Sequence, residues 1–134
     1  MLSRYNQEEV GKLALRLTVG ILMLFHGYSK IMNPGSLDWI GGTLTAYGLP
    51  TVLAYGVYIG EVLAPLMIII GFRARVGGWL IFINMVFALF LAHSGEFLGL
   101  SEHGGWALEL QGFYLVGGLV VALIGSGHFA LKPD

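Results

Sequence analysis

Four long apolar segments dominate the chain, at residues 11–32, 51–72, 76–93 and 107–125. Each is close to the ~20 residues that a helix needs to cross the hydrocarbon core of a bilayer. None of them alternates apolar and polar positions with a period of two, which argues against a transmembrane β-barrel. The pattern therefore predicts an all-α integral membrane protein, a four-helix bundle that takes up residues 1–134 as one domain.

The connection after the first segment, residues 33–50, is too apolar to be a free tether. Its apolar side chains include Leu37, Trp39, Ile40 and Leu44. Such a segment can lie in the membrane interface as a short helix. We therefore expect an interfacial or re-entrant helix that caps the bundle from outside.

Composition supports a membrane protein and excludes some chemistry. The chain is 56% hydrophobic and 11% charged, whereas soluble domains carry about 25% charged residues. It contains no cysteine, so a disulfide, a thiolate nucleophile or a cysteine-ligated cluster cannot form within this polypeptide. The net charge is −1 with no basic patch, so nucleic-acid binding is not expected.

The distribution of charge predicts how the bundle is oriented. Basic residues flank the two termini and the second connection: Arg4, Lys12, Arg73, Arg75 and Lys132. The first and third connections carry Asp38, Glu96 and Glu102, with Lys30 as the one basic residue nearby. By the positive-inside rule, both termini and the 72–76 turn face the cytoplasm, and Trp39 and Trp106 are interfacial anchors in the outer loops.

Glu61 is the principal candidate site residue, because it lies near the middle of the 51–72 segment. A carboxylate at that depth needs a partner, water or a proton. The first segment offers Arg16, His26 and Lys30, which fall within a roughly 80° arc of one helix face. From the helical rise, Glu61 is expected at a depth between His26 and Arg16. Pro65 removes the helical donor of the Glu61 carbonyl, so a kink or an ordered water is expected there.

Two interpretations of this polar group stay open. Glu61 and Arg16 could form a structural ion pair that fixes helix register, or the group could be a functional site for a proton, a ligand or a redox reaction. Lys30 could belong to the site or extend to the outer headgroups. Glu61, His26 and Lys30 are the candidate catalytic residues.

Candidate ligand-binding residues come from all four segments: Arg16, Tyr58, Asn84, His93 and Glu109. Tyr58 lies one helical turn from Glu61 and could supply a hydroxyl. His93 and Glu109 lie near the outer ends of their segments and could instead be interfacial. His103 and His128 are expected to face solvent, and no metal site is predicted because no tight ligand spacing occurs.

Several of these motifs together resemble the DoxX family of small bacterial membrane proteins. They are Arg16, the string His26-Gly27-x-x-Lys30, an acid in the second segment, and the turn Gly71-Phe72-Arg73-x-Arg75. The resemblance implies a multi-pass protein of the bacterial inner membrane with four helices. It also implies a link to redox systems, since the family name comes from a subunit of a thiosulfate:quinone oxidoreductase. Some related proteins use cysteines for dithiol chemistry, and this chain departs from them.

The first functional hypothesis is a membrane subunit of a quinone-linked oxidoreductase. His26 or Lys30 would donate to a quinone oxygen, Glu61 would carry the proton, Tyr58 would position the ring and Arg16 would hold Glu61 ionised. Electrons would come from a soluble or membrane oxidoreductase partner, because no flavin, haem-attachment or iron–sulfur motif occurs.

The alternatives belong to other classes. The chain could be a non-enzymatic carrier of a lipid or small molecule, or a membrane scaffold for a partner enzyme. A haem held by His26 and His93 is a weaker alternative, because two histidines in four helices are common by chance. Gly56-x-x-x-Gly60 could serve packing within the chain or a homodimer.

Overall fold

The computed structural model describes residues 4–33, 35–92, 99, 105 and 108–134, and the described chain is helical throughout apart from turns and one isolated bridge. The elements in order are α1 (Arg4–Met32), α2 (Gly35–Ala46), η1 (Thr51–Tyr55), α3 (Gly56–Tyr58), η2 (Ile59–Leu63), α4 (Ala64–Ile70), α5 (Ala74–Ala92) and α6 (Glu109–Ile124). This confirms the all-α prediction.

The predicted helix ends agree with the structure to within a few residues, except at the start of α1. That helix begins at Arg4 instead of residue 11, because the polar residues before the apolar run contain no helix breaker and simply extend it. α1 ends at Met32, one residue before Asn33-Pro34, as the restriction on the residue before proline predicts. The connection after α1 contains a helix, α2, as predicted.

The second apolar run is not one uniform α-helix. It starts as a 3₁₀ turn in η1, passes through α3, widens to a π-turn in η2 and returns to α-helix in α4. In η2 the Ala64 N–H donates to the Ile59 carbonyl, five residues back. Pro65, in the first turn of α4, explains the break, because its ring would clash with the carbonyl of Glu61 in a regular α-helix.

By length and hydropathy, two helical stretches of the described chain could cross a membrane, Asn6–Met32 and Thr51–Ile70. Ala74–Phe90 and Glu109–Ile124 are shorter apolar helices. The structure therefore shows an all-helical chain with two candidate membrane spans.

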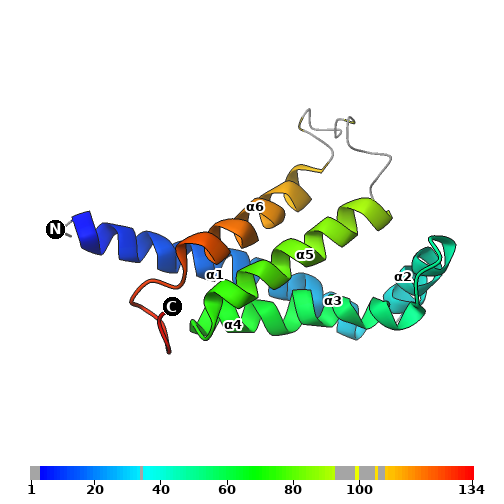
Figure 1. The fold of residues 1–134 in the computed structure, drawn as a ribbon, viewed down its shortest axis with the longest axis horizontal. Helices are drawn as coiled ribbons and strands as arrows, with labels where there is room; N and C mark the ends of the chain where they lie inside the picture. The colour runs from blue at the N-terminus through cyan, green and yellow to red at the C-terminus, as the bar shows by residue number, and fades with distance from the viewer. Residues whose placement is uncertain (1–3, 34, 93–98, 100–104, 106–107) are drawn as a thin grey trace.

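The helices pack around one apolar core (Figure 1). α5 and α6 lie side by side, and α1 contacts α4 and α6. The core cluster contains Val19, Met23, Ala64, Ile68, Ala74, Ile81, Met85, Tyr114 and Val121. A Cβ added at Gly78 would lie 2.6 Å from the Gly118 carbonyl, so these two glycines allow α5 and α6 to approach closely.

The two ends of the molecule differ in character (Figure 1). The start of α1, the turn between α4 and α5, and the segment 125–134 lie at one end, and α2 lies at the other. Gly71 ends α4 with a left-handed backbone, φ 76°, a conformation that glycine adopts without strain. The C-terminal segment pairs with this turn, because the Leu131 and Lys132 N–H groups donate to the Ile70 and Gly71 carbonyls.

Candidate functional site

Glu61 forms the centre of a polar cluster that joins three elements. Its side chain is 8% exposed, and its Oε1 lies 2.5 Å from the Nζ of Lys30 at the end of α1. Its Oε2 accepts a hydrogen bond from the Nδ2 of Asn84 on α5, at 3.2 Å. The carboxylate in η2 is therefore held by one cation and one amide, which satisfies the rule that buried charges are paired.

Two glycines bring the elements of this cluster together. A Cβ at Gly27 on α1 would overlap the backbone carbonyl of Glu61, and a Cβ at Gly60 would overlap the side chain of Asn84. Gly27 and Lys30 are three residues apart and share a helix face. The string His26-Gly27-x-x-Lys30 thus has a structural explanation. Gly27 leaves room for η2 to pack against α1, and Lys30 reaches the carboxylate of Glu61.

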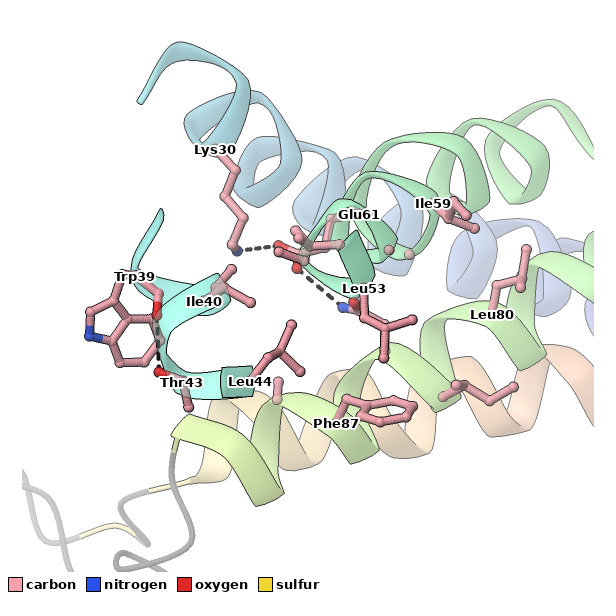
Figure 2. Close-up of a pocket in the computed structure, with 17 residues that line it drawn as sticks. Lys30, Trp39, Ile40, Thr43, Leu44, Leu53, Ile59, Glu61, Leu80 and Phe87 are labelled. Atoms are coloured by element: carbon pink, nitrogen blue, oxygen red, sulfur yellow. Dashed lines mark hydrogen bonds and ion pairs between the residues drawn. The ribbon is translucent and has the colours of Figure 1, made fainter. Parts of the chain in front are cut away.

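The cluster faces a cavity of about 660 Å³, within the size range of small-molecule sites. α2, η1, α3, η2 and α5 form its walls, and Lys30 reaches into it from α1 (Figure 2). The polar side chains in the lining are Lys30, Trp39, Thr43, Glu61 and Asn84. The other lining residues are apolar: Ile40, Leu44, Leu53, Ala54, Gly56, Val57, Ile59, Gly60, Leu80, Ile83, Phe87 and Ala88.

The arrangement can present both a donor and a proton acceptor to a bound molecule. Lys30 has three N–H donors, of which Glu61 takes one. Its side chain is 27% exposed, so the ammonium group is accessible from the cavity. The opposite charges of Lys30 and Glu61 cancel. A ligand in the apolar cavity therefore contacts an ion pair that has a strong dipole but no net charge.

Arg16 does not belong to this cluster, and Glu61 pairs with Lys30 in place of the Arg16 ion pair that was one of the two interpretations of the sequence. Arg16 is 1% exposed. Among the described residues, its guanidinium donates to four backbone carbonyls: to Ile68 at 2.8 Å, Ile69 at 3.2 Å, Ser126 at 2.8 Å and Phe129 at 2.7 Å. The carbonyls of Ile68 and Ile69 lie in the last turn of α4, where helical donors run out. Arg16 therefore caps α4 and fastens the C-terminal segment to it.

Further contacts fix the same end of the molecule. Arg75 Nη1 donates to the Ala122 and Leu123 carbonyls at the end of α6, and its backbone N–H donates to the carboxylate of Asp134. The buried carboxylate of Glu9 accepts a hydrogen bond from the His128 N–H at 2.6 Å. The sequence does not predict these contacts, because several of the acceptors are backbone carbonyls without a side-chain signature and the partners lie up to 119 residues apart.

The remaining candidates lie outside the cavity or outside the described residues. The exposed His26 packs edge-to-face on Tyr114, with ring centroids 5.4 Å apart. Tyr58 packs in the same way on Tyr55 at 6.3 Å. Neither lines the cavity. Glu109 is exposed at the first turn of α6, and His93 lies outside the described residues.

Within the described ranges, no three histidine or acidic side chains come close enough to hold a metal ion. Of the two histidines in the haem alternative, His26 packs on Tyr114 and His93 lies outside those ranges.

The sequence comparisons agree with this helical frame. The profile of the DoxX family matches residues 11–94, well over half of the chain. The chain belongs to the DoxX family. The matched region contains each element of the Lys30–Glu61–Asn84 cluster. DoxX proteins are membrane-associated, which accords with the apolar helices of the fold.

Among curated proteins, the chain is similar to one of Bacillus subtilis (strain 168) that is named "Putative oxidoreductase CatD". The two are 29% identical over 127 residues, which cover 93% of this chain and 87% of that protein. No solved structure matches the chain.

Proposed function

We propose that this DoxX protein is the membrane subunit of a redox system and that it binds a quinone in the Lys30–Glu61–Asn84 cavity. It spans the bacterial inner membrane as a four-helix bundle, with both termini in the cytoplasm. The observation that carries the proposal is the buried carboxylate at the polar end of an otherwise apolar, ligand-sized cavity. Intramembrane carboxylates of this kind usually mark a functional site.

The charge balance of the cavity favours a neutral ligand. A phosphate or carboxylate headgroup would be attracted to Lys30 but repelled by Glu61, and it would leave a net charge in an apolar chamber. A quinone ring has no charge and carries carbonyl oxygens that accept from Lys30. The apolar walls then cover the rest of the ring.

The proton chemistry assigns a role to each polar residue. Reduction of a quinone to a quinol adds two electrons and two protons, and the electrons come from an oxidoreductase partner. Lys30 hydrogen-bonds one ring oxygen. Glu61 takes up a proton from water and passes it to that oxygen, and the second proton reaches the other ring oxygen from water. Asn84 orients the carboxylate through its hydrogen bond to Oε2. The oxidoreductase named among the similar proteins supports a redox role.

The surface supports the membrane placement. Large apolar side chains are exposed on the helices, including Phe25 (66%), Phe90 (63%) and Phe113 (77%), as expected where lipid covers the protein. Arg73 and Arg75 lie at the turn between α4 and α5, and Lys132 lies in the C-terminal segment that pairs with this turn. Lys12 lies against Gly127 of the same segment. The positive-inside rule puts the end of the molecule with these residues in the cytoplasm and α2 at the outer surface.

The test is mass spectrometry of the lipids that co-purify in mild detergent. The wild-type protein is expected to retain a quinone. In Glu61→Gln the amount of retained quinone is expected to fall at least about tenfold, while the fold survives. Glu8→Gln is the matched control, because Glu8 is exposed on α1 and lies outside the cavity. The same loss in both variants, or a wild type without quinone, would contradict the proposal.

A carrier function predicts a different result from the same experiment. The apolar walls would then retain a lipid that has no redox chemistry, and Glu61→Gln would change the amount retained only slightly.

A further inference from the structure

One side of the cavity is left open by the helices of the described chain. η2 contacts α5, whereas η1 contacts α2. Between these two contacts, η1 and α3 on one side and α5 on the other form opposite walls of the cavity. Figure 2 shows Leu53 of η1 and Phe87 of α5 on these facing walls.

Side chains along this side line the cavity and also reach the outer surface. Leu53 is 49% exposed, Ile59 47%, Ile83 48% and Phe87 50%, and all four line the cavity. The cavity is not fully enclosed, and these half-exposed side chains mark its opening to the surface. Leu53 and Ile59 place that opening within the candidate membrane span Thr51–Ile70.

Gly56 lies at this opening. It lines the cavity, yet a Cβ added to it would have no other atom within 4 Å. At Gly60, one turn later, the corresponding space is occupied by the side chain of Asn84. The space over Gly56 is thus open, whereas the space over Gly60, beside Glu61, is occupied.

We propose that this opening is a lateral mouth to the bilayer, and that the apolar tail of the bound quinone leaves the cavity over Gly56, between α3 and α5. The inference rests on the proposed function and narrows the ligand class to quinones with an apolar tail. The head lies against Lys30 and Glu61, and the tail passes Leu53 and Phe87 into the lipid. The ligand then enters from the membrane and not from water.

The experiment compares two probes, a dimethoxy-methyl-benzoquinone without a tail and its decyl derivative. Binding to protein in lipid nanodiscs is measured against empty nanodiscs, for wild type, Gly56→Ala, Gly56→Leu and Gly42→Leu. Gly56 has a right-handed helical backbone, φ −58° and ψ −25°, so both substitutions are compatible with it. Gly42 on α2 is the control, because its Cβ would also meet open space and it does not line the cavity.

Gly56→Leu is expected to weaken binding of the decyl probe about tenfold, equivalent to losing the contacts of about two methylene groups. Gly56→Ala should have a smaller effect in the same direction. The tail-less probe should bind all variants equally, and Gly42→Leu should match wild type with both probes.

The outcomes separate the two proposals. If wild type binds the tail-less probe but Gly56→Leu leaves binding of the decyl probe unchanged, the proposal of a lateral mouth is wrong and the proposed function stands. If Gly56→Leu weakens binding of both probes equally, the proposal of a lateral mouth is also wrong, because the substitution then displaces the head of the quinone. If wild type binds neither probe, the proposed function fails and this inference fails with it.

Discussion

At the scale of single residues, the two partners of the buried ion pair are not equivalent. Glu61 is 8% exposed and Lys30 27%. Removing Lys30 leaves a mostly buried carboxylate without a cation beside it, whereas removing Glu61 leaves an ammonium group on a flexible stem that can extend towards water. Lys30→Met should therefore lower the free energy of unfolding by about 3–5 kcal/mol, and Glu61→Gln by clearly less.

This asymmetry is measured by denaturant unfolding of the detergent-solubilised variants. The double variant Lys30→Met, Glu61→Gln should recover most of the loss, since no buried charge is then left unpaired. Equal losses in the two single variants would contradict the argument from burial.

Arg16 has a structural role that can be separated from ligand binding. Arg16→Gln cannot reach the carbonyls of both α4 and the C-terminal segment, and charge-assisted hydrogen bonds are each worth about 1.5–3 kcal/mol. We expect a loss of at least about 3 kcal/mol of stability, together with faster proteolysis of the segment 125–134. Retention of quinone by the intact fraction should not change. A selective loss of quinone would show that Arg16 contributes to quinone binding.

At the scale of elements, the π-turn of η2 sets the direction in which Glu61 points. Pro65→Ala restores the N–H and removes the clash of the ring with the Glu61 carbonyl. A regular α-helix would then rotate Glu61 relative to α4 by about 100°. Quinone retention should fall even though the helix itself gains stability. The measurement is lipid mass spectrometry, with Pro50→Ala as a control outside η2, and unchanged retention would show that the π-turn is incidental.

The sequence predicts the elements better than their contacts. The apolar runs and Pro34 locate α1, and Leu37, Trp39 and Ile40 locate α2, because these signals are local. Whether Lys30 or Arg16 pairs with Glu61 depends on how α1 packs against η2, and no local sequence signal gives that packing. The depth estimate treats the second run as a straight α-helix, whereas it begins as a 3₁₀ turn and widens at η2, and a lysine stem bridges the remaining gap.

At the scale of the whole molecule, the absence of cysteine makes the orientation directly testable. Gly42→Cys lies on the exposed side of α2, and Lys132→Cys lies in the exposed C-terminal segment. A maleimide that cannot cross membranes should label Gly42→Cys on spheroplasts, and Lys132→Cys only after the membrane is opened. The reverse pattern would invert the proposed topology.

The contacts of Arg16 also have a consequence for how the chain is made. Its acceptors lie 52 residues later, at Ile68, and 110 residues later, at Ser126. A ribosome delivers α1 to the membrane long before either acceptor has been synthesised. An arginine near a helix centre costs about 2.5–3.5 kcal/mol on insertion, and that cost is fully offset only after the segment 125–134 has been synthesised. α1 is therefore made first but completes the hydrogen bonds of Arg16 only when this much later segment packs against it.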